Sequence, residues 1–586
     1  MERTRTHTCG ELRAKHAGEP VTLMGWVHRM RDQGGIFFFD LRDRHGMTQA
    51  TFEPDGPVLL ERVRDLRRED VVAVRGVVRE RPEGLRNDKL ATGAVEVVAE
   101  ELLVLNRAET PPFVIEDEVD ATEEHRLQYR FLDLRRDCMQ RRIVLRHEAA
   151  QAARRYLTGH GFLEIETPLL VRNSPEGARD FLVPSRLTKG RFYSLPQSPQ
   201  IYKQILMVCG FDRYFQIVKC LRDEDLRADR QPEFTQIDAE LSFTTEEEVF
   251  RIMEGLIVEV WKTIRGEALE TPFPVMAYDE AMDRYGSDKP DVRFGLEIRD
   301  VSEAAGASDF RAFRGVLDEG GTVRAIAVPG GASLSRKRID ALEETAKKNG
   351  AAGLAWTKVK EGAFDGGVGR FFPFEALAAA AGAAEGDLIA MVAGPRKIAL
   401  AALGAVRLRL GRELDLIDET RNTFLWVNRF PLFEYSDEEE RWEPAHHMFT
   451  MPLPGDEEKL ESDPAAVHGQ LYDMVLNGVE IASGSIRVHD PELQRRIMAV
   501  VGIRGEEADR RFGFLLNALK YGAPPHGGIA FGWDRLVLLM TGGESIRDVI
   551  AFPKTTSGLS LMDGCPSEVD PELLKDLGLR LERAEE

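Results

Sequence analysis

The chain has 586 residues, of which 43% are hydrophobic and 30% charged, and its formal net charge at pH 7 is −21. The length predicts about four domains, and the composition is typical of a globular protein in water. No apolar stretch is long enough for a membrane helix, and the N-terminus lacks the apolar core of a secretion signal, so we expect neither a membrane partner nor secretion. Five scattered cysteines without a C-x-x-C pair favour the reducing cytoplasm and argue against a structural zinc site.

The negative charge is unevenly distributed along the chain. Residues 1–107 contain 18 Lys and Arg and 18 Asp and Glu, so the net charge of −21 falls entirely on the rest. A neutral segment repels a polyanion least, so this segment is the more favourable place for one to bind. The class of partner stays open at this point.

The same N-terminal segment contains five short strand-like runs, with a helical stretch after the third. This order is typical of an OB-fold barrel, whose strand face commonly binds single-stranded nucleic acid. Alternation in the second run places Phe37, Phe39 and Leu41 on one side and Phe38 on the polar side with Asp40. Phe38 either stacks on a base or packs under a loop, and the pattern does not decide between the two.

Residues 108–138 are rich in acidic and turn-forming residues and are predicted to be a hinge or linker. A helix is predicted from Met139 to His160, where glycines end it, and a strand closed by Pro168 follows. Further on, a loop punctuated by prolines precedes a helix that begins near Pro199.

The stretch from Cys220 to Asp238 is dense in charge and lies between two strand-like runs. A solvated hairpin would explain such a pattern. However, Arg222 and Glu224 are spaced to project from one face of a strand, and Phe234 lies where the chain re-enters the sheet. These side chains could together bind ATP: the guanidinium would pair with a phosphate, the carboxylate would accept from an exocyclic amine, and the aromatic ring would stack on a base.

Residues 286–421 are rich in Ala and Gly and are predicted to form an inserted α+β domain. It should contain a helix from Ser335, its N-cap, to Gly350. The glycine-rich stretch 363–371 lacks the strand-to-helix context of a phosphate loop. From Asn422 strand-like runs return, and the last clear element is a helix after the glycines of PPHGGIAFG.

Three motifs in this order make the chain resemble the class II aminoacyl-tRNA synthetases, specifically the bacterial type of aspartyl-tRNA synthetase. The helix and GFLEIETP, ending at Pro168, resemble motif 1, the dimer-forming element. The stretch with Arg222-Asp223-Glu224 resembles motif 2, and GGIAFGWDRL, with Arg535, resembles motif 3. The resemblance covers nearly the whole chain.

The resemblance implies a multidomain α+β fold with an N-terminal OB-fold β-barrel and a catalytic domain built on an antiparallel sheet. The implied domains are an OB-fold anticodon-binding domain at 1–107, a hinge at 108–138, the first part of the catalytic domain with motifs 1 and 2 at 139–285, the inserted α+β domain at 286–421, and the second part of the catalytic domain with motif 3 and the C-terminal tail at 422–586.

The implied activity is aspartate–tRNA ligation in two steps. Aspartate attacks ATP to give aspartyl-adenylate and pyrophosphate, and the 3′ end of tRNA(Asp) then takes the aspartate. Positioning and charge stabilisation, with Mg²⁺ on the triphosphate, do most of this work, so no protein general base is expected. Whether tRNA(Asn) is a second substrate stays open. The resemblance also implies a cytoplasmic homodimer formed through motif 1.

The resemblance assigns the catalytic role to Arg222, which would hold the α-phosphate and the aspartate carboxylate, and to Arg535, which would reach the γ-phosphate. Phe234 and Arg535 would sandwich the adenine ring, and Glu224 would accept from its amine. The implied ATP-binding positions are Arg222, Asp223, Glu224, Gln231, Phe234, Glu480, Gly532, Trp533, Asp534 and Arg535, and the implied magnesium ligands are Asp473 and Glu480.

For the aspartate side chain, the resemblance implies a bidentate pair with Arg487 and a second positive charge from Lys203, which should reject a neutral amide. His446 and His447 are adjacent, so both cannot face one pocket in a regular strand, and His446 is the preferred contact. The implied aspartate-binding positions are Glu176, Ser198, Gln200, Lys203, Arg222, Asp238, His446, His447 and Arg487.

For the tRNA, Phe38 matches the family position that stacks on the middle anticodon base, and Gln49 and Glu96 match other anticodon-reading positions. At position 33 the family carries Leu in enzymes strict for aspartate tRNA and His in those that also charge asparagine tRNA. The chain has Gln33, which fits neither pattern.

Two alternatives remain. The first is a sister enzyme that charges asparagine or lysine, against which Lys203 and Arg487 argue because their charges would be left unpaired. The second is a non-catalytic RNA-binding paralogue, against which the presence of all three motifs argues.

Overall fold

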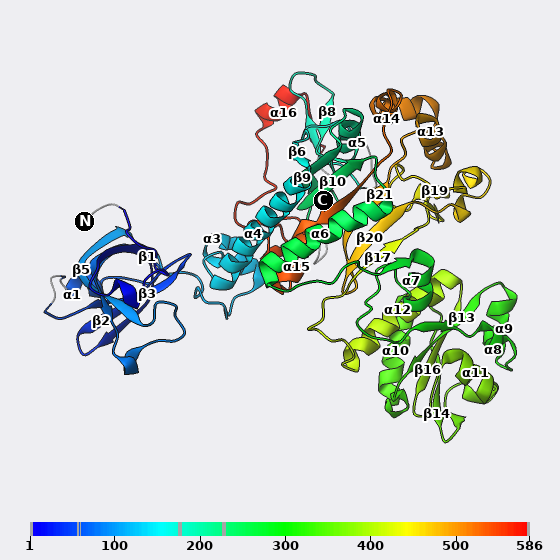
Figure 1. Cartoon of the computed structure of the whole chain (residues 1–586), viewed down its shortest axis with the longest axis horizontal. Coiled ribbons are helices and arrows are strands. Elements are labelled where there is room, and N and C mark those ends of the chain that lie inside the picture. The colour runs from blue at the N-terminus through cyan, green and yellow to red at the C-terminus, as the bar shows by residue number, and fades with distance from the viewer. Residues whose placement is uncertain (1–3, 56–57, 59, 174–177, 225–229, 583–586) are drawn as a thin grey trace. The chain divides into compact units, whose positions relative to one another are not determined.

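The structure is a computed structural model that describes residues 4–55, 58, 60–173, 178–224 and 230–582 (Figure 1). It divides into two compact units, one of Met1–Arg146 with Gly543–Glu568 and one of His147–Gly542 with Val569–Glu586. Within the described ranges, every helix is too short or too polar to cross a lipid bilayer.

Five strands of the first unit close into a barrel in the order β1-β2-β3-β5-β4. They are β1 (Pro20–Gln33), β2 (Ile36–Asp43), β3 (Gly46–Phe52), β4 (Val71–Glu80) and β5 (Val95–Asn106), with α1 (Leu60–Arg64) between β3 and β4. The β3–β5 pair is parallel and the other pairs are antiparallel. Phe37, Phe39 and Leu41 lie in its core and Phe38 is only half-buried, so the predicted OB-fold and the alternation along β2 are confirmed.

The barrel contains a partly buried histidine, His28, which makes the stability of the barrel depend on pH. Nδ1 of His28 lies 3.1 Å from Nη1 of Arg42. Burial, and then the charge of Arg42, lower the pKa of His28 from 6.5 to about 4. Between these values the unfolded chain binds a proton that the folded barrel excludes, so the free energy of unfolding falls as the pH falls through this window.

We expect His28→Gln to abolish this component of the pH dependence. Because the ring is partly exposed, the component is about 1 kcal/mol between pH 7 and pH 4. The measurement is the urea midpoint at both pH values, followed through a fluorine label on Trp26, the one tryptophan of residues 1–107. An equal shift of the midpoint with pH in the parent chain and the variant would contradict the expectation.

The linker after the barrel is ordered by buried charges. It contains α2 (Glu123–Gln128), α3 (Arg130–Asp133) and the start of α4 (Asp137–Gly159). The fully buried carboxylate of Asp133 accepts hydrogen bonds from Arg130 and Arg136. Arg130 also donates to the carbonyl oxygens of Arg547, Ile550 and Ala551, which fixes the linker against the chain segment that follows the last long helix.

The second unit is built on an eight-stranded sheet in the order β11-β17-β20-β21-β22-β10-β9-β6. The strands are β11 (Val275–Ala277), β17 (Phe424–Asn428), β20 (Leu471–Leu476), β21 (Val479–Ile486), β22 (His526–Gly532), β10 (Glu233–Ser242), β9 (Arg213–Leu221) and β6 (Leu163–Glu164). The six central strands are antiparallel, as expected, but both edge strands pair in parallel, so the sheet is mixed. The strand expected up to Pro168 pairs over two residues only.

Three helices pack on β10 and its neighbours: α5 (Gln200–Val208), α6 (Glu246–Arg265) and α15 (Trp533–Thr541). Both ends of α6 are capped, because the Thr245 side chain accepts from the amide of Glu248 and Gly266 ends the helix in a left-handed conformation. The remaining elements are α7 (Tyr278–Tyr285), α13 (Pro491–Val500), α14 (Gly505–Leu519), α16 (Pro571–Leu577) and the hairpins β7–β8 (Leu182–Pro184, Phe192–Ser194) and β18–β19 (Phe433–Ser436, Arg441–Pro444).

A second sheet of this unit has five antiparallel strands in the order β12-β13-β16-β14-β15. They are β12 (Ile298–Asp300), β13 (Thr322–Val328), β16 (Leu388–Gly394), β14 (Ala355–Lys360) and β15 (Ala363–Asp365). Figure 1 shows helices on both faces: α10 (Arg336–Lys348) and α12 (Arg396–Glu413) on one, and α8 (Ser302–Gly306), α9 (Arg311–Asp318) and α11 (Phe374–Ala381) on the other. Ser335 caps α10 as predicted.

The glycine-rich stretch 363–371 forms β15 and a short turn that packs on Trp356. A Cβ atom on Gly367 would lie 1.8 Å from the carbonyl oxygen of Trp356, so close packing explains this glycine without a phosphate.

Candidate active site

The central sheet brings two carboxylates and two cations together. Asp238 and Glu240 lie two residues apart on β10, so their side chains project from one face, and both are buried. Nζ of Lys203, on α5, lies 2.9 Å from Oδ1 of Asp238 and 3.1 Å from Oε2 of Glu240. Arg487, directly after β21, donates its Nε hydrogen to Oε1 of Glu240 at 3.0 Å. Two positive and two negative groups therefore balance one another in a dry environment.

The two carboxylates respond differently to this environment. Burial raises the pKa of Asp238, and the Lys203 ammonium opposes this only in part. Burial also acts to raise the pKa of Glu240, but Arg487 and Lys203 together outweigh it and hold the pKa of Glu240 below its usual value. Glu240 is thus the firmly charged partner of both cations.

Arg487 has most of its hydrogen-bonding capacity engaged. Besides Glu240, it donates through Nη1 to Oγ of Ser485 and to Nε2 of His447, each at 2.7 Å, and through Nη2 to Oε2 of Glu240 at 3.3 Å. These contacts use four of the five N–H groups of a guanidinium. A bidentate pair with a ligand carboxylate therefore requires Arg487 to give up one contact.

The two adjacent histidines lie in a loop, not in a strand, so the regular-strand argument about which of them faces the site does not apply. Nε2 of His447 accepts from Arg487, and its Nδ1 lies 3.3 Å from the Phe449 amide and 3.4 Å from the Thr450 hydroxyl. His446 lies on the other side, with Nδ1 3.4 Å from Oγ of Ser483. Burial, and then Arg487, hold the pKa of His447 well below its ordinary value, so its ring is neutral.

The start of α5 contributes amide and hydroxyl groups beside Lys203. The backbone amide of Gln200 donates to Oγ of Ser198 at 3.3 Å. The Gln200 side chain is buried, and among the described residues its Nε2 has no hydrogen-bond partner. Such a buried donor fits a polar ligand. Glu176, also predicted to bind aspartate, lies outside the described residues.

The predicted nucleotide site lies at the other end of β9 and β10. The guanidinium carbon of Arg222 lies 5.1 Å from the ring centroid of Phe234, a contact that the sequence analysis did not predict. Nε of Arg222 is buried and has no partner within the described ranges. Glu224 accepts from Nη1 of Arg230 at 2.7 Å, and the Asp223 amide donates to the Arg179 carbonyl at 3.1 Å. Part of this loop, 225–229, lies outside the described residues.

The motif around α15 is tied to the same strands. Nη1 of Arg535 donates to the carbonyl oxygen of Glu480 at 2.6 Å. The buried carboxylate of Asp534 accepts from the Thr235 amide at 2.8 Å, and Trp533 is also buried. Asp534 and Trp533 therefore hold α15 against the sheet. The other predicted positions here, Gln231 and Gly532, are buried and half-buried respectively.

Asp473 and Glu480, the predicted magnesium ligands, lie on the neighbouring strands β20 and β21. Asp473 is buried, and its Oδ1 has no hydrogen-bond partner in the described part of the chain. Burial, and then the nearby Glu480 carboxylate, raise the pKa of Asp473 well above its ordinary value. An oxygen without a partner beside a second carboxylate is a donor set that suits Mg²⁺, so these residues fit the ion.

In the barrel, Phe38, Gln49 and Glu96 share one face. Phe38 is opposite Thr51 in the register, and Thr51 and Gln49 both donate to Oε2 of Glu96 at 2.8 Å. Gln33 is exposed at the end of β1. Two arginines that sequence reasoning missed join this face: Arg31 donates to Gln49 at 3.0 Å and Arg79 to Glu96 at 2.7 Å.

The main residue that the sequence analysis missed in the second unit is Glu240. The sequence could have indicated Glu240 through its spacing from Asp238, which puts both carboxylates on one face of a strand. What the sequence could not supply was its partners, since Lys203 and Arg487 come from distant parts of the chain.

Comparisons with known proteins show the family of the chain. The family model described as "tRNA synthetases class II (D, K and N)" matches residues 122–556, and that described as "OB-fold nucleic acid binding domain" matches residues 21–105. The chain is 51% identical over 584 residues to the "Aspartate--tRNA(Asp/Asn) ligase" of Desulfatibacillum aliphaticivorans, covering 99% of this chain and 98% of the relative. To the protein of the same name from Nitratidesulfovibrio vulgaris it is 53% identical over 581 residues, covering 98% and 95%.

Among solved structures, the asparaginyl-tRNA synthetase of Pyrococcus horikoshii, complexed with asparaginyl-adenylate, aligns with a TM-score of 0.59 at 19% identity. The alignment covers 94% of this chain and 98% of that one. At this identity the likeness shows the fold. The two family models and the near-full-length relatives lead to one conclusion: the chain belongs to the class II tRNA synthetases of the D, K and N group, and within it to the aspartate–tRNA ligase family.

Proposed function

We propose that the chain is an aspartate–tRNA ligase. It joins L-aspartate to ATP, giving aspartyl-adenylate and pyrophosphate, and then transfers the aspartate to the 3′ end of tRNA(Asp). The observation that carries the proposal is the buried cluster of Lys203 and Arg487 with Asp238 and Glu240. Asp238 and Glu240 balance these cations in the cluster, but a substrate whose ammonium takes Asp238 leaves one positive charge to match, which suits a negatively charged side chain and not a neutral amide.

In the first step, an oxygen of the aspartate α-carboxylate attacks the α-phosphorus and pyrophosphate leaves. Arg222 lies at the end of β9 beside Phe234, where its buried Nε can serve the developing charge on phosphorus. Lys203 and Arg487 hold the side-chain carboxylate, and Asp238 receives the ammonium. Arg487 exchanges its contact with His447 for the substrate, since the neutral imidazole is a weaker partner than a carboxylate.

The remaining residues position the nucleotide. Arg535 and Phe234 flank the adenine, and Glu224 accepts from its amine. Asp473 and Glu480 would hold Mg²⁺, which when bound shields the charge of the triphosphate. Trp533 and Asp534 act indirectly, by fixing α15 against β10.

The proposal is tested by charging purified tRNA(Asp) and tRNA(Asn) with labelled aspartate and, in separate reactions, with labelled asparagine. We expect aspartate on tRNA(Asp). The printed names of the relatives include both tRNAs, which supports tRNA(Asn) as a second substrate. Failure to charge either tRNA with aspartate, or charging of tRNA(Asn) with asparagine, would overturn the proposal.

The anticodon is bound by the barrel face that contains Phe38. We expect Phe38→Ala to weaken binding of tRNA(Asp) about tenfold, the loss of one base stack, while ATP–pyrophosphate exchange is unchanged. Binding is measured by filter retention at fixed salt. Leu85→Ala, which removes another apolar side chain that is exposed on the barrel, is the control and should bind normally. A Phe38→Ala variant with parent affinity would show that the ring does not stack.

Dimer formation is part of the proposal. The segment that resembles motif 1 exposes Leu163, and the two residues after its last proline, Leu169 and Leu170, are exposed as well; each is about half accessible, and a second copy would cover them. Light scattering should give twice the chain mass of 65.8 kDa, and a monomer at micromolar concentration would contradict this assignment.

A further inference from the structure

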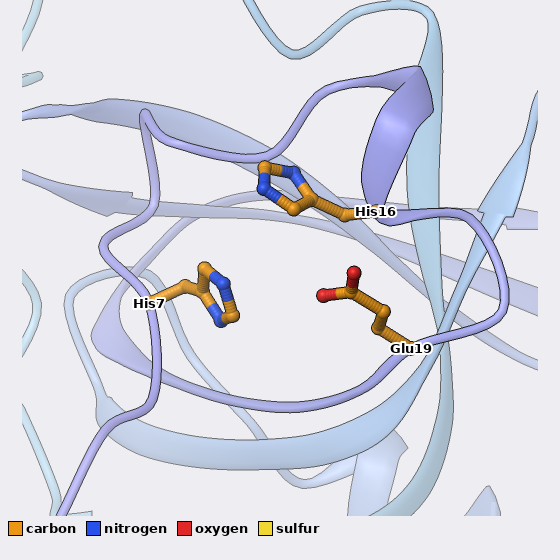
Figure 2. Close-up of side chains that lie close together, drawn as sticks. All are labelled: His7, His16 and Glu19. Carbon is orange, nitrogen blue, oxygen red and sulfur yellow. The ribbon is translucent and has the colours of Figure 1, made fainter.

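A cluster of metal-ligating side chains lies on the N-terminal side of the barrel. His7, His16 and Glu19 each offer one ligand atom, and these atoms all lie within 4.8 Å of one another. Figure 2 shows the two imidazole rings and the carboxylate facing a common space. The rings meet edge to face, with centroids 5.2 Å apart. Neither the predicted reaction nor anticodon binding uses any of the three residues.

Hydrogen bonds fix both segments that supply these side chains. Thr6 exchanges hydrogen bonds with Thr22 of β1: its amide donates to the Thr22 carbonyl at 3.0 Å, and its hydroxyl accepts from the Thr22 amide at 2.9 Å. On the other side, the Gly18 amide donates to the carbonyl of Val78 on β4 at 2.8 Å. The cluster is therefore held between two anchored segments, and most of the ordering that a ligand would impose is already present.

The donor set is that of a borderline divalent ion. Two imidazoles and one carboxylate with a position left open are typical of Zn²⁺ and its neighbours. Tetrahedral zinc places its ligand atoms about 3.4 Å apart, so closing the cluster requires shifts of about 1 Å. Glu19 is exposed and His7 and His16 are half-buried, which gives the side chains this freedom and leaves room for a water ligand.

The hydrogen bonds of the two rings set the strength of such a site. Nδ1 of His7 lies 3.1 Å from the Thr6 hydroxyl, which can accept its proton and leave Nε2 for a metal. Nδ1 of His16 accepts from the Arg13 amide at 2.9 Å, so the neutral ring holds its proton on Nε2. A metal can take His16 only by replacing this hydrogen bond, which makes the site weaker than a fully preorganised one.

We propose that His7, His16 and Glu19 form a three-ligand site for Zn²⁺ that links the segment around His7 to the 16–19 turn that leads into β1. The spacing of the cysteines has no bearing on it, because no thiol takes part. When Nε2 of His16 binds the metal, the ring proton moves to Nδ1 and the Arg13 amide loses its acceptor, so metal loading is coupled to the conformation of the 13–16 turn.

The test uses the full-length chain without a histidine tag, stripped with a chelator and dialysed. Zn²⁺ affinity is measured by competition with a chromogenic chelator, and Co²⁺ is added separately to record the visible bands of a nitrogen- and oxygen-ligated ion. We expect one ion per chain. His7→Ala and His16→Gln should each weaken binding at least about tenfold. His45→Ala, which removes an exposed imidazole of the same barrel outside the cluster, is the control and should bind as the parent does.

Limited proteolysis is the second readout, and it reports whether Zn²⁺ holds the two segments together. Arg13 and Lys15 are exposed trypsin sites within the turn, and Zn²⁺ should slow cleavage there in the parent chain and in His45→Ala but not in His7→Ala. Affinity that is equal in all four proteins, or absence of saturable binding by the parent, would overturn the proposal. If both cluster variants lose saturable binding but Zn²⁺ does not slow cleavage of the parent chain, the metal site is supported and the proposed link between the two segments is wrong.

Discussion

Replacing Arg222 by alanine should reduce aspartate-dependent ATP–pyrophosphate exchange by about 10³-fold or more. The guanidinium lies against Phe234 with a buried Nε that has no partner among the described residues, which supports the proposal that it meets charge on the α-phosphate. Arg222→Lys should recover only part of the rate, since an ammonium keeps the charge but cannot make the bidentate hydrogen bonds of a guanidinium. Binding of tRNA(Asp) should be unchanged, because the anticodon residues belong to the barrel.

The control for this variant is Arg251→Ala. It removes an exposed arginine of α6 that lies 3.8 Å from Glu248, so it loses a charge of the same kind away from the site. Exchange should be normal in this variant. Exchange by Arg222→Ala within tenfold of the parent would contradict the role given to Arg222.

Replacing Arg487 by methionine should lower kcat/KM for aspartate in the exchange reaction by about 10³-fold. Methionine fills similar space but removes the fork that binds Glu240, and Glu240 then keeps Lys203 as its only cationic partner in this cluster. The effect should fall on KM for aspartate, with KM for ATP little changed. Separate titrations of the two substrates measure this split.

Breaking a buried ion pair also destabilises a fold, by about 3–5 kcal/mol. Near-ultraviolet circular dichroism and ATP binding therefore accompany the kinetics. Arg487→Lys separates charge from geometry: it should restore the fold and part of the affinity for aspartate, because the single ammonium cannot reproduce the fork. If Arg487→Met folds and keeps the parent KM for aspartate, the substrate side chain is bound elsewhere.

Local chemistry made much of the fold predictable. The alternation along 36–43 identified the inward face of β2, and Ser335 marked the start of α10. These signals need only neighbouring residues. The edge strand β6 was overestimated, because the length of an edge strand depends on how far its partner runs beside it.

The site was predicted less completely, for a related reason. The family resemblance indicated Asp238 but not that Glu240 binds both cations, since this depends on α5 and the end of β21 meeting β10 in space. Similarly, His446 and His447 could be arranged only once the segment proved to be a loop. Asp534 illustrates the converse: its place in a motif suggested a ligand contact, and its carboxylate holds the Thr235 amide.

The measurement that tests the account most directly is ATP–pyrophosphate exchange by the unmodified chain with aspartate, asparagine or lysine as the only amino acid. The buried pair of cations predicts exchange with aspartate and at least about 10³-fold lower kcat/KM with the other two. Exchange driven by asparagine or lysine and not by aspartate would contradict the assignment of Lys203 and Arg487 to a carboxylate side chain.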